Sequence, residues 1–337
     1  MATDNQFYIF KGNGKQHDGL RDLPPAPPWR SFVKSGEKDR LDPKESRPSE
    51  EGTAWEAEIA AAFQIDEQNL IRDAVNAALF LRRPLLVTGR AGTGKSSIVR
   101  AVARELKLGP VLVWNITSRS SLKDGLYEYD SLGRLQEIQE RQSQKNQEKV
   151  PVADFITLGP LGTALLPARW PKALLIDEID KADLDLPNDL LTLFEGGSFV
   201  IPELERDSDS AKAKVRTWKN FYGKQMIEGG HVGCRAFPFV VLTNNGEREF
   251  SPAFLRRCVR LDVPPPDENM LARIVKAHFK KNLKPHLTAT IREFIERGKK
   301  RQLATDQLLN TIFLLESTEL SPEDRTQLVD LLYRELI

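Results

Sequence analysis

A glycine-rich loop of fixed spacing constrains this chain more than any other feature of its sequence. Residues 84–97 read Pro-Leu-Leu-Val-Thr-Gly-Arg-Ala-Gly-Thr-Gly-Lys-Ser-Ser, which fits the pattern G-x-x-x-x-G-K-S/T. The aliphatic residues 85–87 favour a strand before the loop, and Ile98, Val102 and Leu106 repeat every four residues after it, as a packed helix face requires. Glycines let successive backbone N–H groups surround a phosphate, and the helix adds the positive end of its dipole. The sequence therefore predicts a nucleotide site between a strand and a helix.

The groups of this loop have expected partners on a bound nucleotide. We expect Lys95 to reach the β- and γ-phosphates of ATP and the Ser96 hydroxyl to ligate Mg²⁺. Because the loop contacts phosphates and leaves the base unread, GTP is an alternative to ATP. The residues predicted to bind the nucleotide are Gly89, Ala91, Gly92, Thr93, Gly94, Lys95, Ser96 and Ser97.

A second motif, an aliphatic run that ends in two acids, follows at residues 173–178 with the sequence Ala-Leu-Leu-Ile-Asp-Glu. Buried parallel strands read this way, and their carboxyl ends are where open α/β sheets bind ligands. Asp177 is predicted to hold Mg²⁺ through its water shell, and Glu178 to orient and deprotonate the attacking water. Two surface acids in a turn are the alternative. A second acid separates ATPases that activate water from phosphotransferases, whose substrate brings its own acceptor hydroxyl.

Length and composition limit the class of protein. A chain of 337 residues with 40% hydrophobic content suggests about two domains and a tail. Lys and Arg (49) balance Asp and Glu (48), which gives no global argument for a nucleic acid or membrane partner. Two cysteines exclude a disulfide framework, and the four scattered histidines are interpreted as solvated or capping residues. With neither a signal peptide nor eighteen consecutive apolar residues, a soluble cytoplasmic protein is expected.

Composition divides the chain into three parts. Residues 1–52 are predicted to form an N-terminal strap, in which aromatic residues beside prolines dock on a domain or partner, followed by a charged linker. Residues 53–265 form the nucleotide-binding core, with an excursion at 118–150 and a long insertion at 203–233. Three prolines at 264–266 separate the core from a helical part at 266–337.

Hydrophobic patterns predict the remaining elements. Further strands are expected at 111–114, 237–243 and 258–263, with residues 199–201 as the possible start of a hairpin. Helices are expected at 66–83, 267–282, about 287–299, about 305–317 and 321–336, with a short one at 55–63. Residues 136–149 form either an exposed helix or a mobile loop. The predicted core of the helical part is Leu308, Leu309, Ile312, Phe313, Leu328, Leu331 and Leu332.

The ordered series of motifs resembles the MoxR-like branch of the AAA+ ATPases over roughly residues 66–335. The series comprises residues 89–96, 159–161, 174–180, 190–195, 243–245 and 254–258. The resemblance implies an α/β P-loop NTPase fold with an αβα core, a five-stranded parallel sheet of order 5-1-4-3-2 and a C-terminal helical lid. It also implies a homo-oligomeric ring, usually a hexamer, that remodels, assembles or activates a protein client or co-encoded partner.

The resemblance also assigns residues outside the two motifs. Asn245 aligns with the sensor that positions water, with Asn244 as the competing choice and a plain Asn-Gly turn as the alternative. Arg257 is similar to the arginine finger that reaches the next subunit's γ-phosphate; Arg256 is nearly as good, and a solvated helix end is the alternative. A guanidinium fork would neutralise charge on the transferring phosphoryl group.

The sequence departs from the family in its lid and its insertion. Asp306 stands where a second-sensor arginine is usual and would repel phosphate, so either Arg301 replaces that arginine or coupling to hydrolysis is weaker. The insertion at 203–233 falls where this branch has its pre-sensor hairpin but is longer than expected. Tyr127 and Tyr129 are either pore-loop aromatics that grip a polypeptide or locally packed side chains.

Two other functions would use the same chemistry. A nucleic-acid motor or clamp-loader-like machine is disfavoured by the even charge balance and by the lack of a recognisable nucleic-acid module. A nucleotide-gated switch or scaffold with slow turnover, for example in a bacterial defence system, is supported by Asp306.

Overall fold

The computed structural model describes residues 7–32, 70–145, 148–207, 211–279, 285–298, 303–318 and 321–334. The short helix expected at 55–63, the expected helix start at Asp66 and the alternative sensor Arg301 lie outside these ranges. In the described ranges, no helix combines the length and the apolar character needed to cross a bilayer.

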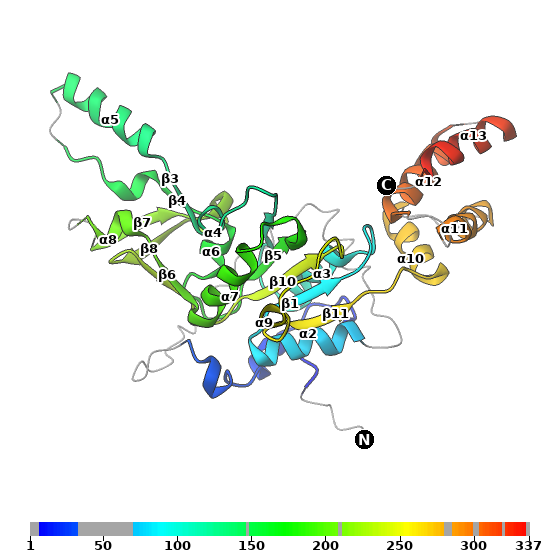
Figure 1. The fold of residues 1–337 in the computed structure, drawn as a ribbon, viewed down its shortest axis with the longest axis horizontal. Helices are drawn as coiled ribbons and strands as arrows, with labels where there is room; N and C mark the ends of the chain where they lie inside the picture. The colour runs from blue at the N-terminus through cyan, green and yellow to red at the C-terminus, as the bar shows by residue number, and fades with distance from the viewer. Residues whose placement is uncertain are drawn as a thin grey trace.

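A parallel sheet of five strands forms the centre of the molecule (Figure 1). Its strands are β1 (Leu85–Thr88), β2 (Leu112–Asn115), β5 (Ala173–Asp177), β10 (Phe239–Asn244) and β11 (Val259–Asp262). The spatial order β11-β1-β10-β5-β2 confirms the predicted order 5-1-4-3-2. All neighbouring strands are parallel, so the carboxyl ends of β1, β5 and β10 meet at one edge. That edge is the expected ligand-binding edge of an open α/β sheet.

Helices cover both faces of this sheet. They are α2 (Leu70–Leu81) and α3 (Lys95–Glu105) on one face, and α6 (Pro160–Ala164) and α7 (Leu186–Gly196) on the other, with α9 (Pro252–Leu255) just before β11. Leu85 and Val87 pack in one hydrophobic cluster with α2 and α3, whereas Leu86 packs in a second cluster with α6 and α7. Burial on both faces explains why these strands read as continuous aliphatic runs.

A second sheet, which the sequence did not predict, combines the excursion with the insertion. Its order is β3-β4-β7-β8-β9-β6. The strands are β3 (Tyr127–Tyr129), β4 (Ile156–Leu158), β6 (Ser198–Val200), β7 (Lys212–Arg216), β8 (Lys224–Glu228) and β9 (His231–Gly233). Near them are α4 (Leu122–Leu126), η3 (Val152–Phe155), α8 (Pro202–Glu205) and η6 (Trp218–Asn220). Several of these strands have three residues, too few for a two-residue period to show in the sequence.

This second sheet settles two open interpretations. Residues 131–143 form helix α5 (Ser131–Ser143), which covers half of the polar stretch at 136–149 and has no buried residue. Tyr127 is 5% exposed, and its hydroxyl donates a 2.7 Å hydrogen bond to Glu203 Oε2, so its ring is packed locally and not presented to a polypeptide. Tyr129 is half-buried beside Arg134.

In the residues that the structure describes, the lid is a bundle of four helices. These are α10 (Glu268–Phe279), α11 (Pro285–Gly298), α12 (Thr305–Ser317) and α13 (Pro322–Leu332). Leu308 and Ile312 are buried as predicted, but Phe313 and Leu331 are 59% and 53% exposed, which corrects the predicted core. Val329 and Tyr333, four residues apart on one helix face, are buried instead because that face of α13 meets α12.

The N-terminal strap, drawn in blue in Figure 1, lies against α2 and α3 on one side of the central sheet. It contains η1 (Gly19–Asp22) and η2 (Pro28–Arg30), and it buries Ile9, Phe10 and Leu20. Asn76 on α2 accepts a hydrogen bond from the Phe10 amide and donates one to the Phe10 carbonyl, at 2.9 and 2.8 Å. These contacts fix the described part of the strap on the core.

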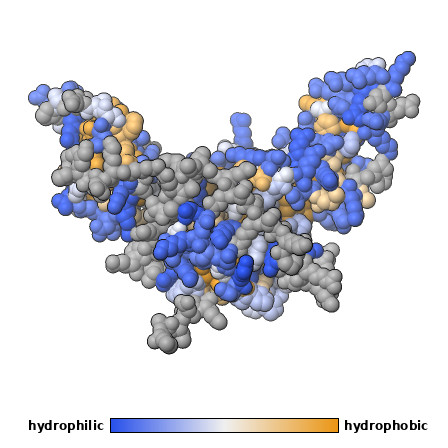
Figure 2. Space-filling model, turned by 180° about the vertical axis from the view of Figure 1, so that it is seen from behind, coloured by the Kyte–Doolittle hydropathy of each residue, from blue (hydrophilic) through white to orange (hydrophobic). Residues whose placement is uncertain are grey.

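Two parts project from the central sheet on the side away from the strap. In Figure 1 they are the second sheet with α5 and, opposite it, the lid. Seen from behind in Figure 2, hydrophobic residues reach the surface on both projections. Leu132 and Leu135 on α5, and Phe313 and Leu331 in the lid, are more than half exposed. The pocket described next lies at the base of the lid.

Candidate active site

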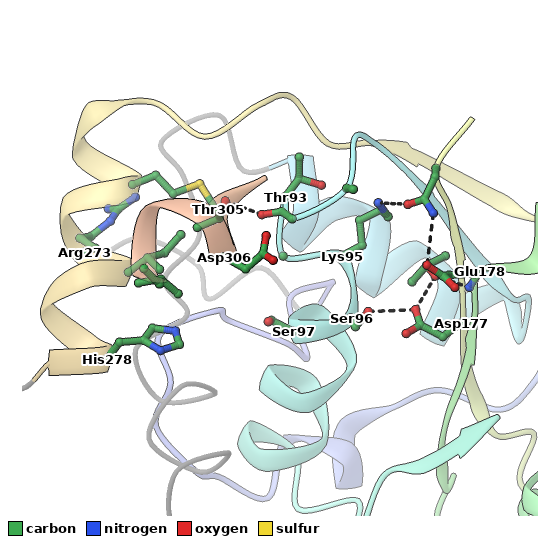
Figure 3. Close-up of a pocket in the computed structure, with 18 residues that line it drawn as sticks. Thr93, Lys95, Ser96, Ser97, Asp177, Glu178, Arg273, His278, Thr305 and Asp306 are labelled. Atoms are coloured by element: carbon green, nitrogen blue, oxygen red, sulfur yellow. Dashed lines mark hydrogen bonds between the residues drawn. The ribbon is translucent and has the colours of Figure 1, made fainter. Parts of the chain in front are cut away.

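A pocket of about 380 Å³ lies between the carboxyl edge of the central sheet and the lid (Figure 3). This volume is in the usual range for small-molecule sites. The core contributes residues 91–97, Asp177, Glu178, Thr243 and Asn245. The lid contributes Met270, Arg273, Ile274, His278, Thr305, Asp306 and Leu309. The structure therefore brings the predicted loop, both acids and one sensor candidate into a single space.

The glycine-rich loop has the backbone that its sequence requires. Gly92 and Gly94 have φ angles of +74° and +81°, which side-chain-bearing residues rarely adopt. Helix α3 begins at Lys95, as predicted, so its N-terminus faces the pocket. The lid closes on the same loop, because the Thr305 hydroxyl donates to the Gly92 carbonyl and a Cβ on Gly92 would lie 2.6 Å from the Thr305 nitrogen.

The Lys95 ammonium is held inside the loop. It donates to the carbonyls of Gly89 and Arg90, at 2.7 and 2.9 Å, and to Asn245 Oδ1 at 2.7 Å. Burial lowers the pKa of Lys95 from its ordinary value, and the carboxylates of Asp177, Asp180 and Glu178 oppose this shift. Gly89 itself lies at the base of the loop, outside the described lining of the pocket. A triphosphate would take the place of some of these acceptors.

Asp177 joins three segments of the core. Its Oδ1 accepts a 2.9 Å hydrogen bond from the Ser96 hydroxyl and a 2.5 Å hydrogen bond from Thr243 Oγ1. A hydroxyl and a carboxylate are oxygen ligands of the kind that Mg²⁺ takes beside substrate phosphates. The donor set of Ser96 and Asp177 therefore fits the predicted metal.

Glu178 is turned out of the strand that precedes it. Strand β5 ends at Asp177, which corrects the predicted end at residue 178, and Glu178 has a left-handed backbone with φ +59° and ψ +49°. From there the chain enters η4 (Ile179–Lys181). The Glu178 amide donates to Thr243 Oγ1 at 2.8 Å, and Lys181 Nζ lies 2.6 Å from Glu178 Oε2. A non-glycine residue in this conformation is uncommon and is typical of functional sites.

The two sensor candidates differ in where they point. Asn245 lines the pocket, and its side chain contacts both Lys95 and Glu178, the latter at 3.5 Å. Asn244 is 6% exposed, and its side chain contacts Thr88 and the Gly246 amide. Asn244 is not among the described residues that line the pocket, so the geometry favours Asn245.

Two residues that position groups of the site, Thr243 and Asp180, were missed, although both lie inside recognised motifs. Thr243 accepts from Glu178 and donates to Asp177, so one hydroxyl fixes both acids. Asp180, 5% exposed, accepts the amides of Asn245 and Glu247 at 2.9 and 3.2 Å. It thereby holds the turn that presents Asn245.

The lid side of the pocket was also missed, apart from Asp306, which lines it in the place the sequence indicated. Met270, Ile274 and His278 occur every four residues on α10, which places them on one helix face. Burial lowers the pKa of His278, and its place in the pocket corrects its interpretation as a scattered solvated residue. Arg273, in the same stretch, is exposed at the rim (Figure 3).

The arginine-finger candidates lie at the other edge of the sheet. Arg257 precedes β11, whose first amide, that of Val259, donates to the Pro84 carbonyl before β1. Because β1 and β11 are parallel, Arg256 and Arg257 are at the amino edge and the loop is at the carboxyl edge. Arg257 is ion-paired with Glu195. Neither arginine is among the described residues that line the pocket. The structure therefore does not bring them to this chain's own site.

A P-loop, an acid pair and an asparagine amide at one edge of a 5-1-4-3-2 parallel sheet, closed by a helical lid, define a nucleotide-binding protein of the AAA+ class. The family model of the AAA domain (dynein-related subfamily) matches residues 84–258, slightly more than half of the chain. The chain belongs to this family.

Comparison of whole proteins adds little. No curated protein matches this chain. Among solved structures, that of PCH-2 from C. elegans is similar, with 14% identity and a TM-score of 0.37, and the match covers 85% of this chain and 69% of that chain. A likeness of this size supports no statement about function.

Proposed function

We propose that this protein is an ATP- and Mg²⁺-dependent ATPase of the MoxR-like branch, which works as a ring and remodels, assembles or activates a protein partner. The observation that carries the proposal is the convergence of Lys95, Asp177 and Glu178 on one pocket from segments far apart in the sequence. Membership of the AAA family supports nucleotide binding at this place.

Each side chain has a task in hydrolysis. Lys95 and the amides of residues 89–97 would bind the phosphates, and Ser96 and Asp177 would hold Mg²⁺, which supplies neutralising charge beside them. Glu178 would take the proton of the attacking water, and Asn245, within reach of both Glu178 and Lys95, would orient that water. Asn245 Nδ2 and Glu178 Oε1 lie 3.5 Å apart, so one water could contact both groups.

The position of the arginines supports the proposed ring. Arg257 and Arg256 are separated from the loop by the length of β1, four residues or about 13 Å of strand. Either arginine would therefore reach a γ-phosphate only on another copy of the chain. A contact between two different faces of one protein is heterologous, and it closes into a ring when the rotation permits. Hydrolysis would then remove the phosphate that the finger contacts and change the subunit contact.

Substitution of Glu178 by Gln tests the assignment. We expect the variant to bind a fluorescent ATP analogue as the parent does but to lose steady-state turnover, because the amide takes no proton from water. Glu249→Gln, which changes an exposed acid that is not among the described lining residues of the pocket, is the matched control and keeps turnover. Normal hydrolysis by the Glu178 variant would show the proposal to be wrong. The same variant, loaded with ATP, is suited to capturing the partner by affinity purification.

A second candidate, a nucleotide-gated switch with slow turnover, is favoured by two contacts. Asp306 places a negative charge in the pocket, and Lys181 is ion-paired with the proposed base. Lys181→Met removes that pair. If the protein is a switch, its ATP-driven assembly is faster than its single-turnover hydrolysis, and the substitution accelerates hydrolysis. If it is an active remodelling enzyme, turnover keeps pace with assembly.

A further inference from the structure

The N-terminal strap presents an exposed tryptophan beside the arginine-finger candidate Arg257. Trp29, in η2, is 74% exposed, although large aromatic side chains are mostly buried on average. It lines a recess of about 340 Å³ together with Arg30, Arg83, Glu195 and Arg257. The strap and the proposed finger therefore share one surface.

The strap is held so that this tryptophan faces outward. The Arg30 guanidinium lies 5.2 Å from the centroid of the Phe32 ring and 5.0 Å from that of Phe237, and it donates to the Arg82 carbonyl. Arg82 in turn donates to the Pro24 carbonyl at 2.6 Å. With residue 30 anchored inward, its neighbour in the short 3₁₀ turn points in another direction. The contacts of the adjacent residues thus offset the conformational entropy that is lost when Trp29 is held in one position.

The recess combines positive charge with apolar surface. Of its described lining residues, three are arginines and one is a glutamate, while Phe194 and Leu191 supply apolar walls. The pocket at the opposite edge of the sheet is lined by the acids Asp177, Glu178 and Asp306 and by the cations Lys95 and Arg273. The phosphates of a bound nucleotide would add negative charge there, which complements the arginines of the recess. An arginine-rich recess with an exposed tryptophan has the composition of an interface hot spot.

We propose that Trp29 and the recess around Arg257 form the contact with a second copy of this chain, on that copy's nucleotide-pocket face. This inference rests on the proposed function, in which Arg257 or Arg256 reaches the neighbour's γ-phosphate. Any group beside Arg257 must then lie against the same neighbour. The strap, which lies outside the residues matched by the family, is thereby a component of the subunit interface.

Assembly of the Trp29→Ala variant tests the inference. The background is the full chain with Glu178→Gln in saturating ATP, and the readout is the oligomer distribution in sedimentation velocity. Because truncation of a buried aromatic anchor at an interface hot spot costs at least about 2 kcal/mol, we expect the dissociation constant to rise by at least about thirtyfold. Leu132→Ala is the matched control, since Leu132 is 72% exposed on α5, away from the recess, and assembly of that variant is expected to match the parent.

A photo-crosslinking residue at position 29 gives an independent readout. We expect ATP-dependent dimers in which the crosslinked peptide comes from residues 91–97, 268–279 or 305–309, the pocket face of the other copy. Crosslinks confined to one chain, or a Trp29→Ala variant that assembles like the parent, would overturn the inference and leave the ring intact. If the parent itself fails to assemble with ATP, the proposed ring and this inference both fall, while binding of the fluorescent analogue still reports on the pocket.

Discussion

Thr243 Oγ1 lies 2.5 Å from Asp177 Oδ1 and donates a hydrogen bond to it. The same oxygen accepts the amide of Glu178 at 2.8 Å. A single hydroxyl on β10 therefore orients the proposed metal ligand and the proposed base, which follow one another at the end of the neighbouring strand β5.

Loss of the Thr243 hydroxyl should impair hydrolysis more than binding. In Thr243→Val the shape is kept but both hydrogen bonds are lost, and groups that orient metal ligands typically contribute 10–100-fold to activity. We expect turnover to fall by about that factor and the affinity for a fluorescent ATP analogue to change little. Thr243→Ser, which keeps the hydroxyl, is expected to restore most of the turnover. Equal turnover in the valine and serine variants would contradict the positioning role.

Neutralisation of Asp306 should strengthen nucleotide binding. Its carboxylate lines the pocket that is proposed to hold the phosphates, so it repels them. In Asp306→Asn we expect the dissociation constant for ATP to fall by about fivefold, corresponding to roughly 1 kcal/mol, in fluorescence titrations at low salt. Glu323→Gln, an exposed acid elsewhere in the lid, should leave the dissociation constant unchanged. Weaker binding by the Asp306 variant would mean that this carboxylate helps to hold the ligand.

Glu105 should be the anchor of the strap. Its carboxylate is fully buried and accepts the amides of residues 11–14 at 2.6–3.1 Å, with His17 Nε2 at 3.2 Å. Glu105→Ala leaves these donors without an acceptor, so we expect the free energy of unfolding to fall by about 3 kcal/mol. Hydrogen exchange of the amides of residues 11–14 should accelerate. Glu140→Gln on α5 is the control, and slow exchange of these amides in the alanine variant would disprove the anchor.

The two cysteines should resist alkylation in the folded protein. Burial raises the pKa of Cys234 and Cys258 from 9.0 to about 12. At pH 9 each folded thiol is then ionised to about one part in a thousand, whereas an unfolded thiol is half ionised, and the thiolate is the reactive form. Because the unfolded state loses its thiol protons first, the free energy of unfolding declines as the pH rises above 9. Iodoacetamide labelling followed by mass spectrometry should show both thiols modified only in denaturant.

Local sequence predicted the elements of the core well because the information is local. Aliphatic runs at 85–87 and 173–176 became strands that are buried on both faces, and Ile98, Val102 and Leu106 became the buried face of α3 and its cap. The strand order came from resemblance and was confirmed by the pairing. The strands of the second sheet carry little such signal, since they are short and some pair over long stretches of chain, as Thr157 does with Arg216.

By itself, the sequence determined the loop, the acid pair and the helical lid, since each depends on residues close together along the chain. Only the tertiary structure decided which side chains meet. It joined Ser96 to Asp177 across 81 residues, put Asn245 rather than Asn244 in the pocket, and left Arg257 at the far edge of the sheet. It also brought α10 over the loop and the strap to Glu105. The physical reason is that such contacts depend on strand register and on how helices pack over the sheet, which short-range patterns do not encode.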